Sequence, residues 1–306
     1  MIAASIVVTV SVALAIQLPP PLKSLGAHEL VLVGAGDIAR CDSRGDEATA
    51  KLVQSVLDVS DAAWAFTAGD NVYPNGTLEE FRRCYEPSWG PFKARTLPTV
   101  GNHDARTKRS AGLRATFAGR FSQDGPLWYA VDVKGDGSDG HAAAWRVVVL
   151  DSNCDQVDCT EDGAQYAWLK DELRRQKAKG TSCTVAVFHH PRFSSGPHGD
   201  ATAMAPMWRL LDERGVDLVV AGHDHIYERF AALDDGGAQK PGGLPSIVSG
   251  LGGASRYPIV WARAGSIFRK DDRDGVLVLR LRSDGYTGAL WTTDGEVHDV
   301  HEGRCR

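Results

Sequence analysis

Polar residues that can bind metal ions follow five apolar segments typical of buried β-strands. The segments are VLVGAGD, AWAFTAGD, LPTVGNHD, CTVAVFHHP and VDLVVAGHDH, and they supply Asp37, Asp70, Asn102, His103, Asp104, His189, His223 and His225. Open α/β sheets bind their ligands at the carboxyl ends of strands, so these side chains can converge in one cleft. A strand that ends in Gly-Asp is common, but five polar endings in series favour a single functional site.

Carboxylate, amide and imidazole groups in this combination favour a centre for two metal ions. Divalent and trivalent cations bind such donors, and two ions about 4 Å apart need one carboxylate between them. His223 and His225 would face opposite sides of a regular strand. The chain should leave the strand after Gly222, however, so both can face one centre. The alternative, that the candidate ligands are unrelated structural residues, requires a separate explanation for each of them.

The surrounding pattern predicts alternating strands and helices followed by a β-rich tail with Asp-Gly turns. Trp128–Val133 and Trp145–Asp151 flank the segment KGDGSDGHAAA and predict an antiparallel hairpin. No repeat or interdomain linker is evident, so residues 27–306 are expected to form one α/β domain with two sheets and outer helices. The other expected strands are Glu29–Ala35, Ala63–Thr67, Cys183–Phe188 and Val216–Val220, and the expected helices are Asp46–Leu57, Thr77–Tyr85, Asp162–Lys179 and Ala203–Arg214.

The first 22 residues have the composition of a leader. Residues 2–16 are apolar and uncharged and precede the Pro-rich QLPPPL, but they fall short of the roughly 20 residues that span a bilayer. Ala13-Leu14-Ala15 resembles a signal-peptidase site, although no Lys or Arg precedes the apolar run. We expect a cleaved signal peptide and a secreted or extracytoplasmic protein. An uncleaved anchor and an N-terminal core strand are the alternatives.

Six cysteines agree with export, because an even count outside the cytosol favours disulfides. Cys154 and Cys159 are close enough in sequence to pair locally. Many other pairings are possible, and we suggest Cys41 with Cys84 and Cys183 with Cys305. Zinc ligation by cysteine is the alternative, but it lacks the usual CxxC spacing.

The charge balance argues against nucleic acid as the main partner. The formal net charge is -5 and the pI is near 6.1, whereas phosphate-backbone binding needs a dense cationic face. Arg106, Lys108 and Arg109 form a local basic cluster after GNHD. A solvated loop is the favoured interpretation of this cluster, and attraction of an anionic substrate is the alternative.

The motif series GD, GDN, GNHD, H-x-P and GHxH resembles that of the calcineurin-like metallophosphoesterases. The resemblance runs from about Asp37 to Arg229 and then into the β-rich tail. The resemblance implies a four-layer αββα sandwich with two mixed β-sheets flanked by helices. Most of that superfamily has a His two residues beyond the first Asp, where this chain has Ala39. The purple acid phosphatase branch lacks this His and has a Tyr three residues after the bridging Asp, as Tyr73 is here. A packed aromatic residue is the alternative role for Tyr73.

The resemblance also implies roles for individual residues. Asp37, Tyr73 and His225 would form a first site suited to Fe(III). Asn102, His189 and His223 would form a second site for Fe(II), Zn(II) or Mn(II), with Asp70 bridging the two. His103 would act as a catalytic acid, with Asp104 fixing its tautomer. His198 would be a second catalytic or substrate-binding group, or else an exposed loop residue.

The resemblance predicts a phosphatase that hydrolyses small-molecule phosphate monoesters by attack of a metal-bound hydroxide. The leader and the cysteines predict that it is secreted. A phosphodiesterase acting on nucleotides or lipid headgroups would use the same metal centre. A family member that binds metal without turnover is a further alternative. No nucleic acid partner or stable membrane span is expected, and the sequence sets no oligomeric state.

Overall fold

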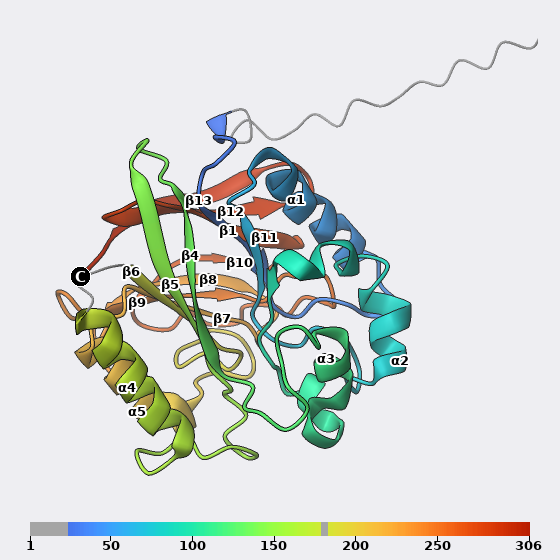
Figure 1. Cartoon of the computed structure of the whole chain (residues 1–306), viewed down its shortest axis with the longest axis horizontal. Helices are drawn as coiled ribbons and strands as arrows, with labels where there is room; N and C mark the ends of the chain where they lie inside the picture. The colour runs from blue at the N-terminus through green and yellow to red at the C-terminus, as the bar shows by residue number, and fades with distance from the viewer. Residues whose placement is uncertain (1–23, 179–182) are drawn as a thin grey trace, which may run out of the picture.

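The computed structural model describes residues 24–178 and 183–306, which form two β-sheets with helices on their outer faces (Figure 1). The first sheet has six strands in the order β13-β12-β11-β1-β2-β3. Strands β1, β2 and β3 are parallel, and β11 continues the sheet antiparallel to β1. The bounds are β1 Val31–Ala35, β2 Trp64–Thr67, β3 Thr96–Leu97, β11 Gly275–Leu281, β12 Gly285–Thr292 and β13 Val297–Arg304.

The second sheet has seven strands in the order β10-β8-β9-β7-β6-β5-β4. Its central strands β5, β6, β7 and β9 are parallel, whereas β4, β8 and β10 pair antiparallel to their neighbours. Both sheets are therefore mixed. The bounds are β4 Tyr129–Asp136, β5 Ala142–Val149, β6 Cys183–Val187, β7 Leu218–Ala221, β8 Tyr227–Leu233, β9 Leu244–Ser249 and β10 Ser266–Lys270.

Helices cover the outer face of each sheet. Helix α1 lies on the side of the first sheet, and α4 and α5 lie together on the side of the second (Figure 1). The α-helices are α1 Gly45–Val59, α2 Leu78–Glu80, α3 Ala111–Thr116, α4 Ala164–Ala178 and α5 Ala205–Glu213. The short helical turns are η2 Phe81–Tyr85, η3 Gly90–Arg95, η4 Asp104–Arg106, η5 Lys108–Ser110 and η6 Thr202–Met204.

Strict alternation of side chains separates the layers. In β1, Val31 and Val33 pack in the cluster that includes α1, whereas Leu32 packs between the sheets. In β5, Val149 points into the inter-sheet core and Val148 packs toward α4 and α5. Successive residues of a strand face opposite sides, so each strand serves two cores. This confirms the expected αββα sandwich.

Several predicted elements differ in extent. Thr77–Tyr85 is not one α-helix: Thr77 and Glu80 form a capping box for the short α2, and the π-type turn η2 follows. The hairpin is antiparallel as predicted, but its strands are longer toward the tip, since β4 continues to Asp136 and β5 begins at Ala142. Helix α3 and strands β3, β8 and β10 were not predicted. Their segments are short or mix polar and apolar residues without a clear period.

Three disulfides join Cys41 to Cys84, Cys154 to Cys159 and Cys183 to Cys305, which confirms all three suggested pairings. The bond at Cys41 ties the loop after Asp37 to η2, 43 residues away in sequence. The predicted signal peptide lies outside the described residues. None of the helices in the described part of the chain has the length and apolar character needed to span a membrane.

Candidate metal centre

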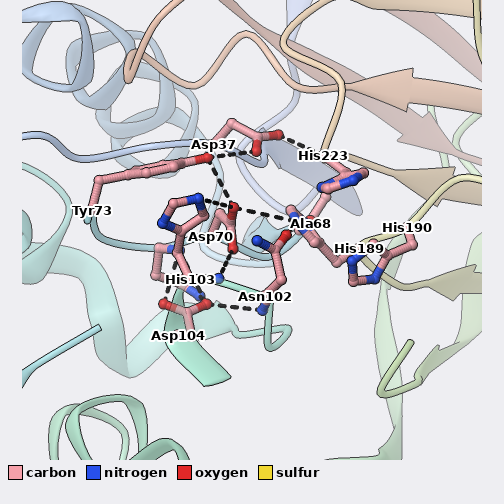
Figure 2. A network of polar contacts seen from close by, with 12 residues as sticks. Asp37, Ala68, Asp70, Tyr73, Asn102, His103, Asp104, His189, His190 and His223 are labelled. Atoms are coloured by element: carbon pink, nitrogen blue, oxygen red, sulfur yellow. Dashed lines mark hydrogen bonds and ion pairs between the residues drawn. The ribbon is translucent and has the colours of Figure 1, made fainter. Parts of the chain in front are cut away.

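The candidate ligands gather where the carboxyl ends of the two sheets meet (Figure 2). Asp37 follows β1, Asp70 follows β2 and Asn102 follows β3, all in the first sheet. His189 follows β6 and His223 follows β7, in the second. Main-chain hydrogen bonds link the two edges, since Gly36 N donates to Ser249 O at 2.7 Å. Residues far apart in the chain therefore share one site.

Three of these residues have left-handed backbone, which side chains other than glycine seldom adopt. The φ angles are 61° at Asp37, 48° at Asp70 and 71° at His223. Gly69 has a φ of 86°, and a Cβ at this position would lie 2.5 Å from His189 Nδ1. Such strained turns are typical of functional sites, because the surrounding fold must hold them in place. Here they occur at two of the clustered carboxylates and at one of the clustered imidazoles.

The Tyr73 hydroxyl is the centre of a first group of donors. It lies 2.8 Å from Asp37 Oδ1, 2.9 Å from Asp70 Oδ2 and 3.0 Å from His225 Nε2. All four residues are buried, with Tyr73 the most exposed at 6%. Two carboxylate oxygens, a phenol oxygen and an imidazole nitrogen thus converge within hydrogen-bonding distance.

The His189 imidazole is the centre of a second group. Its Nε2 lies 3.0 Å from Asn102 Oδ1 and 3.3 Å from Asp70 Oδ2, and the His223 ring is 4.9 Å away between centroids. His189, His190 and His223 also lie close enough together to share a cation. Asp70 contributes the same oxygen to both groups, so the two sets of donors adjoin through one carboxylate.

The donor chemistry fits a pair of metal ions. Oxygen-rich donors with a phenol suit a hard cation, and imidazole with amide oxygen suits a divalent one. The remaining ring nitrogens have partners that orient them: His189 Nδ1 lies 2.8 Å from Ala68 O, and His225 Nδ1 lies 2.6 Å from Ser255 Oγ. Such contacts hold a ligating imidazole with its other nitrogen toward the centre.

Shared protons link the donors of this cluster. Burial raises the pKa of Tyr73 well above its ordinary value, and Asp37 and Asp70 raise it further, so the phenol is a neutral donor. Burial opposes the charged form of His189, but the Asp70 carboxylate outweighs it and raises the imidazole pKa to about 9. Burial also opposes ionisation of Asp70, yet His189 holds the pKa of that carboxyl below its ordinary value. Cations bound here would replace these protons.

His103 lies at the exposed side of the cluster. Its main-chain N donates to Asp70 Oδ1 at 2.7 Å, and its ring packs 4.3 Å from that of Tyr73. Nδ1 lies 2.6 Å from Pro74 O, and a carbonyl can only accept, so Nδ1 carries a proton. This leaves Nε2, 3.9 Å from Asp70 Oδ2, to exchange a proton with a bound molecule.

Asp104 does not hold the His103 ring, contrary to the role suggested from the sequence. Its buried carboxylate accepts from Gly101 N at 2.9 Å, Asn71 Nδ2 at 2.8 Å and Asn71 N at 3.1 Å. Burial raises the pKa of Asp104 to about 7. The residue joins the loops that carry Asp70 and Asn102, and Pro74 O takes the place beside the imidazole.

His198 reaches the second group from the loop after β6. Its exposed ring stacks on His223, with centroids 4.3 Å apart and planes 28° apart. Asp224, which lies between the two histidines of GHDH, accepts from His198 N at 3.0 Å and from Ser194 Oγ at 2.5 Å. The structure therefore brings all the predicted site residues close together.

Residues that sequence reasoning missed complete the rim. The Tyr257 ring stacks on His225, with centroids 4.1 Å apart and planes 15° apart, and Ser255 contacts the same imidazole. Both come from the loop after β9. No pattern in the sequence predicts this contact. The position of Asp224 between the two histidines of GHDH, in contrast, could have identified Asp224 as a residue of the site.

A sequence model described as calcineurin-like phosphoesterase matches residues 30–227. The chain belongs to this family. Purple acid phosphatase 23 of Arabidopsis thaliana is 28% identical over 240 residues, which are 70% of this chain and 50% of that relative. This similarity agrees with the branch indicated by Ala39 and Tyr73, and relatives of this kind imply a dinuclear metal centre.

Solved structures support the same fold. Purple acid phosphatase PPD1 from yellow lupin seeds has a TM-score of 0.69 and 19% identity, covering 91% of this chain and 54% of that one. GAP50, the anchor in the inner membrane complex of Plasmodium, has a TM-score of 0.67 and 17% identity, covering 91% and 90%. The chain spans about half the length of the curated plant relatives that it matches.

Proposed function

We propose that this protein is a secreted phosphatase that hydrolyses phosphate monoesters with the help of two metal ions. The observation that carries the proposal is the shared Asp70 oxygen, which lies 2.9 Å from the Tyr73 hydroxyl and 3.3 Å from His189 Nε2. A carboxylate between two groups of donors suits adjacent cations. The family membership and the plant relatives point to the same class of reaction.

Asp37, Tyr73 and His225 would hold the first ion, and Asn102, His189 and His223 the second, with Asp70 between them. The phenol favours Fe(III) at the first position, and the second suits Fe(II), Zn(II) or Mn(II). When bound, such ions acidify water and neutralise charge on phosphoryl oxygens.

The chain's own residues would bind the ester and move the protons. His103 Nε2 faces the cleft while its Nδ1 proton is held by Pro74 O. After a water oxygen adds to phosphorus and the ester P–O bond breaks, the protonated Nε2 would give its proton to the departing oxygen. The products are an alcohol and inorganic phosphate. The exposed His198 ring stacks on His223 of the second group of donors, and from there it would donate to a phosphoryl oxygen.

Export is part of the proposal. Three disulfides suit an oxidising compartment, and the apolar residues 2–16 have the composition of a signal peptide.

The test compares 4-nitrophenyl phosphate with bis(4-nitrophenyl) phosphate, using metal-reconstituted protein. We expect the monoester to be the better substrate. His103→Ala should lower kcat about 10²- to 10⁴-fold with metal content unchanged, whereas His141→Ala, an exposed histidine outside the cleft, should match the wild type. A diester preference would make the protein a phosphodiesterase. A metal-loaded protein inactive on both esters would make it a non-catalytic family member.

A further inference from the structure

Arg106 is a cation beside the metal centre that the proposed reaction does not use. It ends the turn η4, two residues beyond the GNHD aspartate Asp104, and its side chain is exposed. Nη1 donates to Pro74 O at 2.9 Å, the same carbonyl that faces His103 Nδ1. Nη2 lies 3.5 Å from His103 Nε2. The guanidinium is therefore fixed against the imidazole that faces the cleft.

The three basic residues of this segment have different surroundings. Arg109 pairs with Asp124, and exposed Lys108 lines with it a hollow that contains none of the candidate ligands. Arg106 makes its contacts only with Pro74 O and His103 among the described residues, and neither partner is a carboxylate. A guanidinium has five N–H donors in a planar fork, so most of those of Arg106 remain open to a ligand.

We propose that Arg106 forms a second anion subsite, which selects phosphate monoesters that carry another anionic group near the ester oxygen. The proposal rests on the proposed function for the position of the first phosphate. A guanidinium binds carboxylate and phosphate alike through paired N–H donors. The ligand class is thus a phosphate ester with a second carboxylate or phosphate.

The distances limit where the second anion sits. A departing oxygen that takes a proton from His103 Nε2 lies about 3 Å from that atom. An anion held by Arg106 lies about 3 Å from Nη2, and the two nitrogens are 3.5 Å apart. Groups on neighbouring carbons of one small molecule fit this separation. We therefore expect the subsite to favour compounds with the anion on the carbon next to the ester carbon.

Binding of three shape-matched phosphonates to the metal-loaded protein tests the subsite without turnover. Propylphosphonate carries one anionic group. At the chain end away from the phosphonate, 3-phosphonopropionate has a carboxylate in place of the methyl group, and ethane-1,2-diphosphonate has a second phosphonate. Calorimetry should give a Kd for 3-phosphonopropionate or for ethane-1,2-diphosphonate that is about tenfold lower than the Kd for propylphosphonate. The probe with the larger gain identifies the second group as carboxylate or phosphate.

Two variants decide whether Arg106 causes the preference. In Arg106→Gln, the Kd values of the three probes should lie within about threefold of one another, and the Kd for propylphosphonate should stay near that of the wild type. Lys108→Gln removes the same charge from the same segment and should keep the full preference. No preference in the wild type, or an equal preference in Arg106→Gln, would overturn the proposal. So would equal weakening of all three probes, because Arg106 would then act on the first anion or on His103.

Turnover separates this proposal from the proposed function. 2-Phosphoglycerate and glycerol 2-phosphate differ only in a carboxylate next to the ester carbon, and Arg106→Gln should lower kcat/KM about tenfold for the first alone. Absence of turnover for both, with the phosphonate preference intact, would refute the phosphatase and leave the subsite standing. If both compounds are hydrolysed and the ratio of their kcat/KM values is the same in the wild type and in Arg106→Gln, only the subsite would be refuted.

Discussion

Replacing Tyr73 by Phe removes the one atom that contacts Asp37, Asp70 and His225 together. The ring itself is buried and packs against His103, so phenylalanine fills the same space. The variant therefore isolates the hydroxyl. Its loss should have two effects. It removes hydrogen bonds that stabilise the metal-free protein, and it removes one ligand of the first proposed ion.

The first effect follows from the two short contacts. The single hydroxyl proton is shared by carboxylate oxygens at 2.8 and 2.9 Å, so its loss removes about one hydrogen bond to a charged group. Such a bond contributes about 1.5–3 kcal/mol. The free energy of unfolding of metal-free Tyr73→Phe should fall by that amount, since the Asp37 and Asp70 carboxylates would both lose the hydroxyl donor that they share. Urea unfolding measures this difference.

The second effect appears on loading with Fe(III). An iron–phenolate pair absorbs visible light, so the wild-type protein should turn pink to violet and Tyr73→Phe should stay colourless. Tyr129→Phe is the matched control, because that hydroxyl donates to Pro98 O at 3.0 Å, outside the cleft. The control should keep its colour and lose only about 0.5–1.5 kcal/mol of stability. A Tyr73→Phe protein with wild-type colour and stability would refute the placement of the phenol between the carboxylates.

Two further predictions concern Gly69, which lies beside the centre, and Asp46, a buried carboxyl of α1 that accepts from Ser88 Oγ. Gly69→Ala should lower the free energy of unfolding by about 1–3 kcal/mol and abolish hydrolysis, because a Cβ at a φ of 86° would meet the His189 ring. Thermal unfolding and an activity assay measure the two effects, and wild-type values for both would contradict the prediction. Burial raises the pKa of Asp46 to about 7, so the folded protein binds more protons than the unfolded chain between about pH 4 and pH 7. Stability should therefore fall as the pH rises through this window. Asp46→Asn should remove this pH dependence and raise the free energy of unfolding by about 1–3 kcal/mol above pH 7, allowing for solvent screening. A pH profile of unfolding equal to that of the wild type would contradict a raised pKa at Asp46.

Residue types at strand ends made most of the site predictable. Asp37, Asp70 and His189 each follow a buried apolar run, and parallel strands bring their carboxyl ends to one edge. The alternation of inward and outward residues in β1 and β5 likewise made two sheets with outer helices predictable. These features depend on local periodicity and on the general geometry of sheets.

Loop conformation explains what the sequence did not reveal. Pro74 O faces His103 because the loops after β2 and β3 lie together, and Asp104 is drawn to Asn71 and Gly101 instead. Tyr257 reaches His225 through a loop whose sequence has no periodic signal. Such contacts depend on tertiary packing between distant segments, and no spacing along the chain specifies them.

The most direct test of the central claim is the metal content of reconstituted protein, measured by elemental analysis after removal of loosely bound ions. We predict two ions per chain in the wild type. Asp70→Asn should lose both, because its oxygen serves both groups of donors, while Tyr129→Phe should keep both. One ion or none in the wild type, or two in Asp70→Asn, would contradict a centre built around a shared carboxylate.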